Sequence, residues 1–313
     1  MDGKRWAIVL CSAGLGVGAA VGAGACGEDR GSVDVEGAST GKTGTTGTTG
    51  TTTGAATVDR NATDPKKLAA AMAQIKIYAQ KQAGGLVTAS QDLQKAVDAG
   101  DVPAAKKAYA EGRPYYERIE PLVALFPELD GKIDAREDDF PKKAADPKWT
   151  GFHPIEWDLW KNDKITAKTK AKAAGLVKDS KRLDVLMSKA VVKPEVVIPG
   201  TAELIDEVEE SKITGEEERY SKLDLPTFVA NLEGAQEFYS TLSPLVKAKD
   251  PALDKQIKEG FKDAFAEVNT LKKGGKFVSY DELSDAQQKQ VKQTVEALAE
   301  PLARVQGVLG AKQ

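Results

Sequence analysis

The sequence contains a single histidine, His153, and only two cysteines among its 313 residues. One histidine is too few for a zinc peptidase of the H-E-x-x-H type, which needs two histidines one helical turn apart and a glutamate as general base. The formal net charge of −3 leaves no basic surplus that would indicate nucleic-acid binding. Alternating strand patterns are almost absent, and the apolar stretch 191–200 is interrupted by Pro194 and Pro199. We therefore expect an all-α protein that is neither a peptidase of this type nor a nucleic-acid-binding protein.

The first 25 residues have the pattern of a secretory signal. A short basic start is followed by an apolar, Gly/Ala-rich run that ends in "AGAC" at Cys26. Small residues directly before a cysteine resemble the bacterial lipobox, in which that cysteine is lipidated and becomes the new N-terminus. We predict that residues 1–25 are a lipoprotein signal peptide and that Cys26 anchors the protein to the plasma membrane, on its extracytoplasmic face. An ordinary signal cleavage or an uncleaved anchor is the alternative. Cys11 would be removed, so no second cysteine remains for a disulfide.

The composition changes twice along the rest of the chain. Residues 26–63 are rich in threonine and glycine and have no apolar periodicity, which predicts a flexible, disordered tether. From residue 64 onward the apolar residues recur with helical spacing, as at Leu68, Met72 and Ile75. Asp64 before a proline is typical of a helix start.

Two segments of the helical part resemble each other. The segments 115–134 and 237–258 both pass from an aromatic helix through "PLV" and a short loop into "LD", which opens another helix. This similarity predicts two helical units related by an internal repeat, at 64–195 and 196–313, each a bundle of three to four helices. A chance likeness between helices rich in Ala, Lys and Leu is the alternative.

Acidic residues suited to chemistry are concentrated in the first of these units. Glu117 and Glu120 are three positions apart, so on a helix their carboxylates lie on one face, and His153 and Glu156 repeat this spacing. In four-helix bundles, glutamates and Glu-x-x-His pairs that project inward from facing helices build metal sites. An imidazole with several carboxylates suits iron, zinc, manganese or copper, and so many carboxylates favour a highly charged ion such as iron(III).

Helix capping explains the same residues without a metal. His153 directly before Pro154 is typical of an N-cap, with Glu156 at the third helical position, where a carboxylate meets the positive end of the helix dipole. Glu117 and Glu120 could likewise belong to a surface network of ion pairs. The spacing alone leaves both interpretations open.

The stretch "GFHPIEWDLW" at 151–160 resembles the G-x-H-x-x-E motif of the imelysin family. The wider region 115–160 and the segment 214–236, "TGEEERYSKLDLPTFVANLEGAQ", are similar to the Efe-type iron-uptake proteins within that family. The resemblance covers the chain from about residue 65 to its end. It implies an exported protein of two four-helix lobes that binds iron or another divalent metal. It also implies two partners, a membrane iron permease and a heme peroxidase of the dye-decolorizing type.

The resemblance further implies roles for single residues. The implied metal ligands are the E-x-x-E pair Glu117 and Glu120, the aspartate Asp134, and the H-x-x-E pair His153 and Glu156. One of the three glutamates at 216–218 would approach the ion from the second unit, and the resemblance does not say which.

Iron in either oxidation state is the expected ion, with zinc and copper as alternatives. Many relatives carry a cupredoxin domain before the helical part, where this chain has the predicted tether, so we expect a short form of the family. The family also carries a peptidase label. With one histidine only a carboxylate-based variant of that chemistry is conceivable, and we expect no enzyme. A function of another class, binding of an anionic polysaccharide, would use the Lys-rich segment 161–182, which is equally explained as a solvated helix face.

Overall fold

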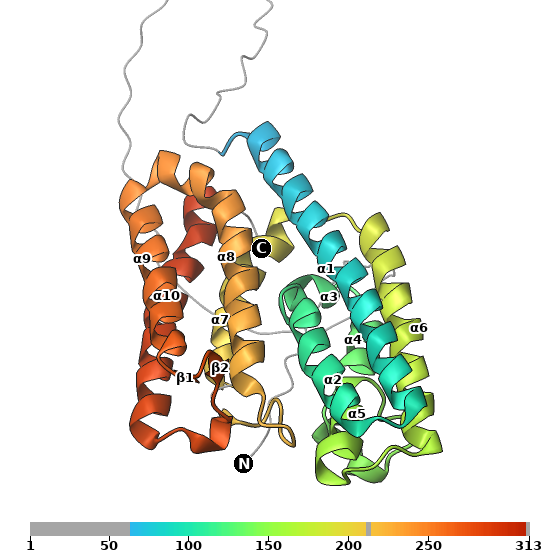
Figure 1. Cartoon of the computed structure of the whole chain (residues 1–313). Helices are drawn as coiled ribbons and strands as arrows, with labels where there is room; N and C mark the ends of the chain where they lie inside the picture. The colour runs from blue at the N-terminus through green and yellow to red at the C-terminus, as the bar shows by residue number, and fades with distance from the viewer. Residues whose placement is uncertain (1–62, 211–213, 311–313) are drawn as a thin grey trace, which may run out of the picture. The chain divides into compact units, whose positions relative to one another are not determined.

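The computed structural model describes residues 63–210 and 214–310. The predicted signal peptide, Cys26 and all but the last residue of the predicted tether lie outside these residues. These described residues form one compact unit. Its described part contains ten α-helices and one short β-hairpin, so the predicted all-α class is confirmed (Figure 1). Among the described helices, none combines the length and the apolar character needed to cross a membrane.

Long and short helices alternate along the described chain. The helices are α1 (Pro65–Ala99), α2 (Val102–Glu117), α3 (Glu120–Val123), α4 (Pro127–Ile133), α5 (Phe152–Glu156), α6 (Ala167–Lys189), α7 (Pro194–Glu210), α8 (Asp224–Lys249), α9 (Pro251–Asn269) and α10 (Asp285–Leu309). A turn of π-helix, Trp157–Lys161, extends α5. The strands β1 (Lys272–Lys273) and β2 (Lys276–Phe277) pair in antiparallel fashion.

The helices pack in two sets within this unit. In the first set, α1 packs along α2 and α6, and the short helices α3, α4 and α5 follow α2 (Figure 1). In the second set, α7 and α9 each pack against both α8 and α10, which closes a ring of four long helices. Contacts of α1 and α2 with α8 join the sets, and buried apolar side chains from both form one core.

The first set differs from a regular four-helix bundle because it has three long helices and three short ones. The chain between α2 and α6 is rich in prolines, which lack the N–H that a helix interior needs. These prolines are Pro121, Pro127, Pro141, Pro147 and Pro154. The result is a series of short helical turns that places polar side chains at one end of α2.

Capping residues fix where α1 begins and ends and where α2 begins. Asp64 accepts a hydrogen bond from the N–H of Lys66 at 2.9 Å, as expected for the helix start. Gly100 ends α1 with φ at 74°, a conformation that glycine adopts at little energetic cost. Asp101 then caps α2 by accepting from the N–H of Ala104 at 3.0 Å.

The predicted boundary between the two units falls inside a helix. α7 begins at Pro194, whereas the sequence pattern places the boundary between residues 195 and 196. A proline is compatible with the first turn of a helix, and Pro199 further along removes only one backbone hydrogen bond. The connection between α6 and α7 is the segment 190–193.

Candidate metal centre

Glu117 and Glu120 do not lie on one helix, which corrects the prediction. α2 ends at Glu117 and α3 begins at Glu120, because Pro121 has no N–H with which to bond the Glu117 carbonyl. Nδ2 of Asn231 on α8 donates to that carbonyl at 3.2 Å and to Oε2 of Glu120 at 3.3 Å. The break separates the two glutamates. Glu117 is buried beside Arg113, whereas Glu120 lies against α8.

Gly151 brings the start of α5 against the end of α4. Its φ is 94°, and a Cβ at this position would lie 2.1 Å from the carbonyl oxygen of Ile133. Asp134 follows Ile133 directly and His153 follows two residues after Gly151, so this approach brings the carboxylate and the imidazole together. α5 begins at Phe152 with Gly151 as its N-cap, and the interpretation of His153 as the N-cap is therefore wrong.

We expect Gly151→Ala to disturb both the fold and the metal centre. The positive φ alone costs about 1–3 kcal/mol for a residue with a side chain, and the clash with Ile133 adds to this. The free energy of unfolding in urea and the affinity for zinc should both fall. Gly175→Ala on α6 is the matched control, since no atom lies within 4 Å of its new Cβ. Equal stability of the two variants would contradict this role for Gly151.

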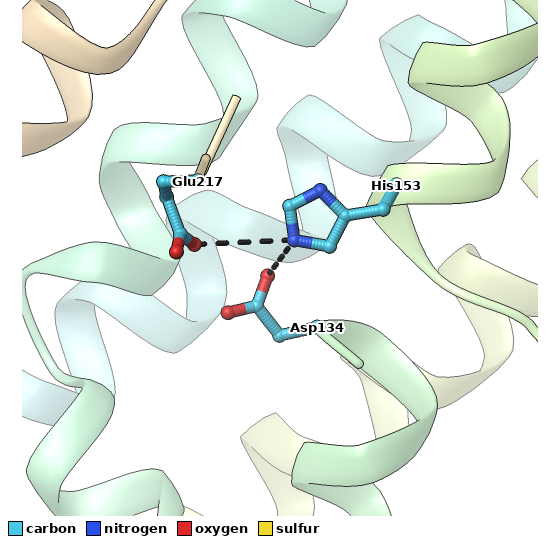
Figure 2. A group of neighbouring side chains, drawn as sticks. All are labelled: Asp134, His153 and Glu217. Carbon is cyan, nitrogen blue, oxygen red and sulfur yellow. Dashed lines mark ion pairs between the residues drawn. The ribbon is translucent and has the colours of Figure 1, made fainter. Parts of the chain in front are cut away.

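The two ring nitrogens of His153 both face carboxylates. Its side chain is 2% exposed, and Nδ1 donates to Oε2 of Glu156 at 3.3 Å, because a carboxylate can only accept. Nε2 is buried, and its two contacts with carboxylate oxygens are long ion pairs rather than well-aligned hydrogen bonds. It lies 3.4 Å from Oδ1 of Asp134 and 3.9 Å from Oε1 of Glu217. Ligand atoms of these three residues all lie within 4.8 Å of one another. Figure 2 shows the side chains of Asp134 and Glu217 facing the same nitrogen of the His153 ring.

The surrounding carboxylates keep the imidazole protonated in the ion-free site. Burial by itself would lower the pKa of His153, but the close carboxylates of Asp134 and Glu156 favour the charged ring and raise it to about 10. A metal ion at Nε2 therefore has to displace a proton.

Both carboxylate oxygens of Glu156 are already bound by the protein. Oε2 receives the His153 ring, and Oε1 accepts from the N–H groups of Tyr220 at 2.9 Å and Ser221 at 2.7 Å. Glu156 thus ties the imidazole to the loop 214–223, which carries Glu217. This geometry fits a residue that orients the imidazole better than it fits a metal ligand.

Asp224 holds the same loop from the other side. It is 1% exposed, its Oδ1 accepts from the N–H of Glu218 at 3.1 Å, and its Oδ2 has no hydrogen-bond partner. Burial raises the pKa of Asp224 to about 6. The ionised form is therefore disfavoured in the folded protein relative to the unfolded chain.

Asp224→Asn is expected to stabilise the protein at neutral pH and not in acid. The raised pKa favours folding fully below about pH 4, and that contribution is lost as the pH rises through 6. Asparagine keeps the acceptor for Glu218 but does not ionise, so the variant should gain up to about 3 kcal/mol over wild type between pH 4.5 and 7. Urea unfolding of the variant and of wild type at pH 4.5 and at pH 7 measures the difference in their free energies of unfolding. A gain that is the same at both would contradict the assignment.

Arg113, which sequence reasoning did not select, lies among the acidic residues of the site. It comes from α2, and its side chain is 1% exposed. Its guanidinium forms ion pairs with four carboxylates, those of Glu117, Asp134, Glu217 and Glu218. Its positive charge compensates several buried negative charges that otherwise would be costly.

A small recess borders the triad formed by Asp134, His153 and Glu217. His153 and Glu217 line it, together with the rings of Trp149 and Tyr220. At its rim, Arg219 donates to Glu137 at 3.0 Å and to Asp138 at 2.6 Å, which joins the loop 214–223 to the segment after α4. Two of the three grouped side chains are therefore reached from this recess.

The structure separates the three neighbouring glutamates that sequence reasoning left undecided. Glu217 joins His153 and Asp134. Glu216 pairs instead with Arg219 at 2.8 Å, and Glu218 pairs with Arg113 at 2.6 Å. Burial raises the pKa of Glu218 to about 8, which the charge of Arg113 opposes.

Comparison with known proteins places the chain in a family. Residues 71–305 match the imelysin family, which also bears the label Peptidase M75. The chain belongs to the imelysin family. The resemblance noted in the sequence is confirmed, and the G-x-H-x-x-E motif of this imelysin protein is the stretch that places His153 at the site.

Two curated relatives are named "Iron uptake system component EfeO". The protein from Yersinia pseudotuberculosis is 41% identical over 247 residues, which cover 79% of this chain and 66% of the relative. The protein from Escherichia coli K12 is 41% identical over 258 residues, which cover 82% and 68%. The chain thus spans about two thirds of the length of these relatives.

A solved structure shares the fold at low sequence identity. It is a putative iron-regulated protein A precursor from Parabacteroides distasonis, with a TM-score of 0.64 and 15% identity, covering 79% of this chain and 96% of the other. The imelysin family label refers to peptidases, whereas the curated relatives are named as components of iron uptake.

Proposed function

We propose that this imelysin protein is an exported, membrane-anchored component of an Efe-type iron-uptake system, which captures a transition-metal ion. His153, Asp134 and Glu217 would hold the ion. The observation that carries the proposal is the buried group of His153, Asp134 and Glu217, in which Nε2 of His153 faces two carboxylates at 3.4 and 3.9 Å. A metal ion between these ligand atoms would supply the close partners that the ring nitrogen lacks.

The donor set is consistent with iron as the cargo. One imidazole nitrogen and carboxylate oxygens suit iron, zinc, manganese and copper. Iron is favoured because the relatives that are 41% identical are named as iron-uptake components. Zinc and copper remain the alternatives to either oxidation state of iron.

The other predicted ligands receive different roles in this proposal. Glu156 orients the imidazole, and Glu117 balances the charge of Arg113. Glu120 stays outside the ligand set, because it bonds to Asn231.

The wider setting of the protein is proposed on the same grounds. Cys26 would carry the lipid anchor after removal of residues 1–25, and residues 26–63 would act as the tether. A membrane iron permease and a dye-decolorizing-type heme peroxidase would be the partners. The helix sets 64–195 and 196–313 would be two lobes that arose from one repeat. No enzymatic step is needed for this function, and a single histidine does not suit the peptidase label.

The alternative, binding of an anionic polysaccharide by the segment 161–182, is weakened for three of the segment's seven lysines. Nζ of Lys161 lies 3.8 Å from the centre of the Trp157 ring. Lys170 donates to a backbone carbonyl on α1, and Lys172 pairs with Asp158 at 2.8 Å. These three lysines are engaged within the protein.

Titration of the metal-free protein tests the proposed function. Iron(II) without oxygen, iron(III), zinc and copper(II) would each be added, and binding followed by calorimetry and by metal analysis after gel filtration. The proposal requires one tightly held ion per chain for iron in at least one oxidation state. Retention of none of these ions would contradict it.

A further inference from the structure

Arg113 is built into the metal centre as a second, permanent cation. All three nitrogens of its guanidinium contact carboxylates. Nε lies 2.6 Å from Glu218, one terminal nitrogen lies 2.5 Å from Glu117 and 2.9 Å from Glu217, and the other pairs with Asp134. The side chain is 1% exposed, so water screens these interactions weakly.

Two of the oxygens that Arg113 contacts also face the histidine. Oδ1 of Asp134 and Oε1 of Glu217 pair with the guanidinium, and the same two atoms lie 3.4 and 3.9 Å from Nε2 of His153. An ion held by Nε2 would draw on these oxygens too. Guanidinium and ion therefore depend on the same negative charge.

We propose that Arg113 determines the affinity of the centre by competing with the metal ion for Asp134 and Glu217. This inference rests on the proposed function, since it concerns the same site. Without an ion, the guanidinium compensates the buried carboxylates and keeps them in place. When a metal ion is bound, the guanidinium is a second positive charge at close range in a buried site. Its repulsion lowers the affinity of the site for the ion. A carrier that must pass its cargo on benefits from such a limit.

The usual role of a residue that hydrogen-bonds to a metal ligand predicts the opposite. Such residues orient the ligand, and their removal typically lowers metal affinity by about 10–100-fold. The sign of the change on replacing Arg113 therefore separates the two roles.

The test uses zinc as a redox-stable probe and two substitutions in the full chain. Arg113→Gln removes the charge, and Arg113→Lys keeps the charge but cannot reach all the carboxylates in the same way. Zinc affinity is measured by competition with a chelator, and the melting temperature is recorded with and without zinc. We expect Arg113→Gln to bind zinc about tenfold more tightly or better, with Arg113→Lys between it and wild type. The metal-free Gln variant should melt lower than wild type, and zinc should raise its melting temperature by more.

Arg118→Gln is the matched control. Arg118 lies near the end of the same helix, is 24% exposed and pairs with Glu233 away from the triad, so its loss should leave zinc affinity unchanged. If Arg113→Gln does not fold without metal, Arg113→Lys decides alone. Zinc binding by Arg113→Lys that is equal to or weaker than wild type overturns the inference. Failure of wild type itself to bind zinc, iron or copper would instead overturn the proposed function.

Discussion

His153→Ala is expected to weaken the binding of iron or zinc by more than about 100-fold, beyond the loss that follows when only a supporting partner of a ligand is removed. His153 supplies the one nitrogen of the triad, and the remaining carboxylates of Asp134 and Glu217 are both paired with Arg113. Without the imidazole nitrogen as a ligand, we expect these carboxylates to stay paired with Arg113 and to bind an ion only weakly. Calorimetric titration of the metal-free variant measures the loss.

Glu120→Gln is the control for this prediction. The family resemblance makes Glu120 a ligand, whereas in the structure it accepts a hydrogen bond from Asn231. Metal affinity should change by less than about threefold, because Glu120 is not part of the group of Asp134, His153 and Glu217. Circular dichroism of both variants must show the wild-type helix content. If His153→Ala binds iron and zinc as tightly as wild type, the triad is not the metal site.

Glu156→Gln is expected to lower metal affinity by about 10–100-fold, even though one atom changes. The carboxylate receives Nδ1–H of His153, which leaves Nε2 as the ligand atom. If the side-chain oxygen of glutamine keeps the bonds to Tyr220 and Ser221, its NH₂ group must face the imidazole. The ring then favours the tautomer with its proton on Nε2, which cannot bind an ion.

The tautomer can be read directly. In the metal-free Glu156→Gln protein, nitrogen chemical shifts of the single histidine should report Nε2–H at a pH where the ring is neutral. Loss of affinity with the proton still on Nδ1 would show that Glu156 acts only through the loop 214–223. Glu156→Ala distinguishes the loop role, because it leaves the N–H groups of Tyr220 and Ser221 without their acceptor and should destabilise the fold by about 1–3 kcal/mol.

Local signals in the sequence predicted the helical fold and the place of the histidine. The spacing of Leu68, Met72 and Ile75 depends only on the period of a helix, and all three side chains face inward, Ile75 fully. The glycine of the G-x-H-x-x-E motif was visible too. The structural role of this glycine could not be predicted, since Gly151 approaches Ile133, which lies 18 positions earlier in the sequence.

The grouping of Asp134, His153 and Glu217 could be predicted only in part, because it depends on contacts between distant segments. Three glutamates in a row at 216–218 carry no periodicity, and Glu217 is selected by a loop that Glu156 and Asp224 hold from two sides. The separation of Glu117 from Glu120 was accessible in principle, since Pro121 cannot continue the helix.

The role of Arg113 had only a weak signal in the sequence. It stands four residues before Glu117, a spacing that is common for exposed ion pairs on helices. Its burial among four carboxylates arises from the way α2, the end of α4 and the loop 214–223 meet, which no single segment encodes.

Anomalous X-ray diffraction from crystals loaded with iron, recorded on both sides of its absorption edge, tests the central claim most directly. We expect one strong iron peak per chain, about 2.0–2.2 Å from Nε2 of His153 and from carboxylate oxygens of Asp134 and Glu217. An iron peak elsewhere, or one that Nε2 of His153 does not touch, would contradict it.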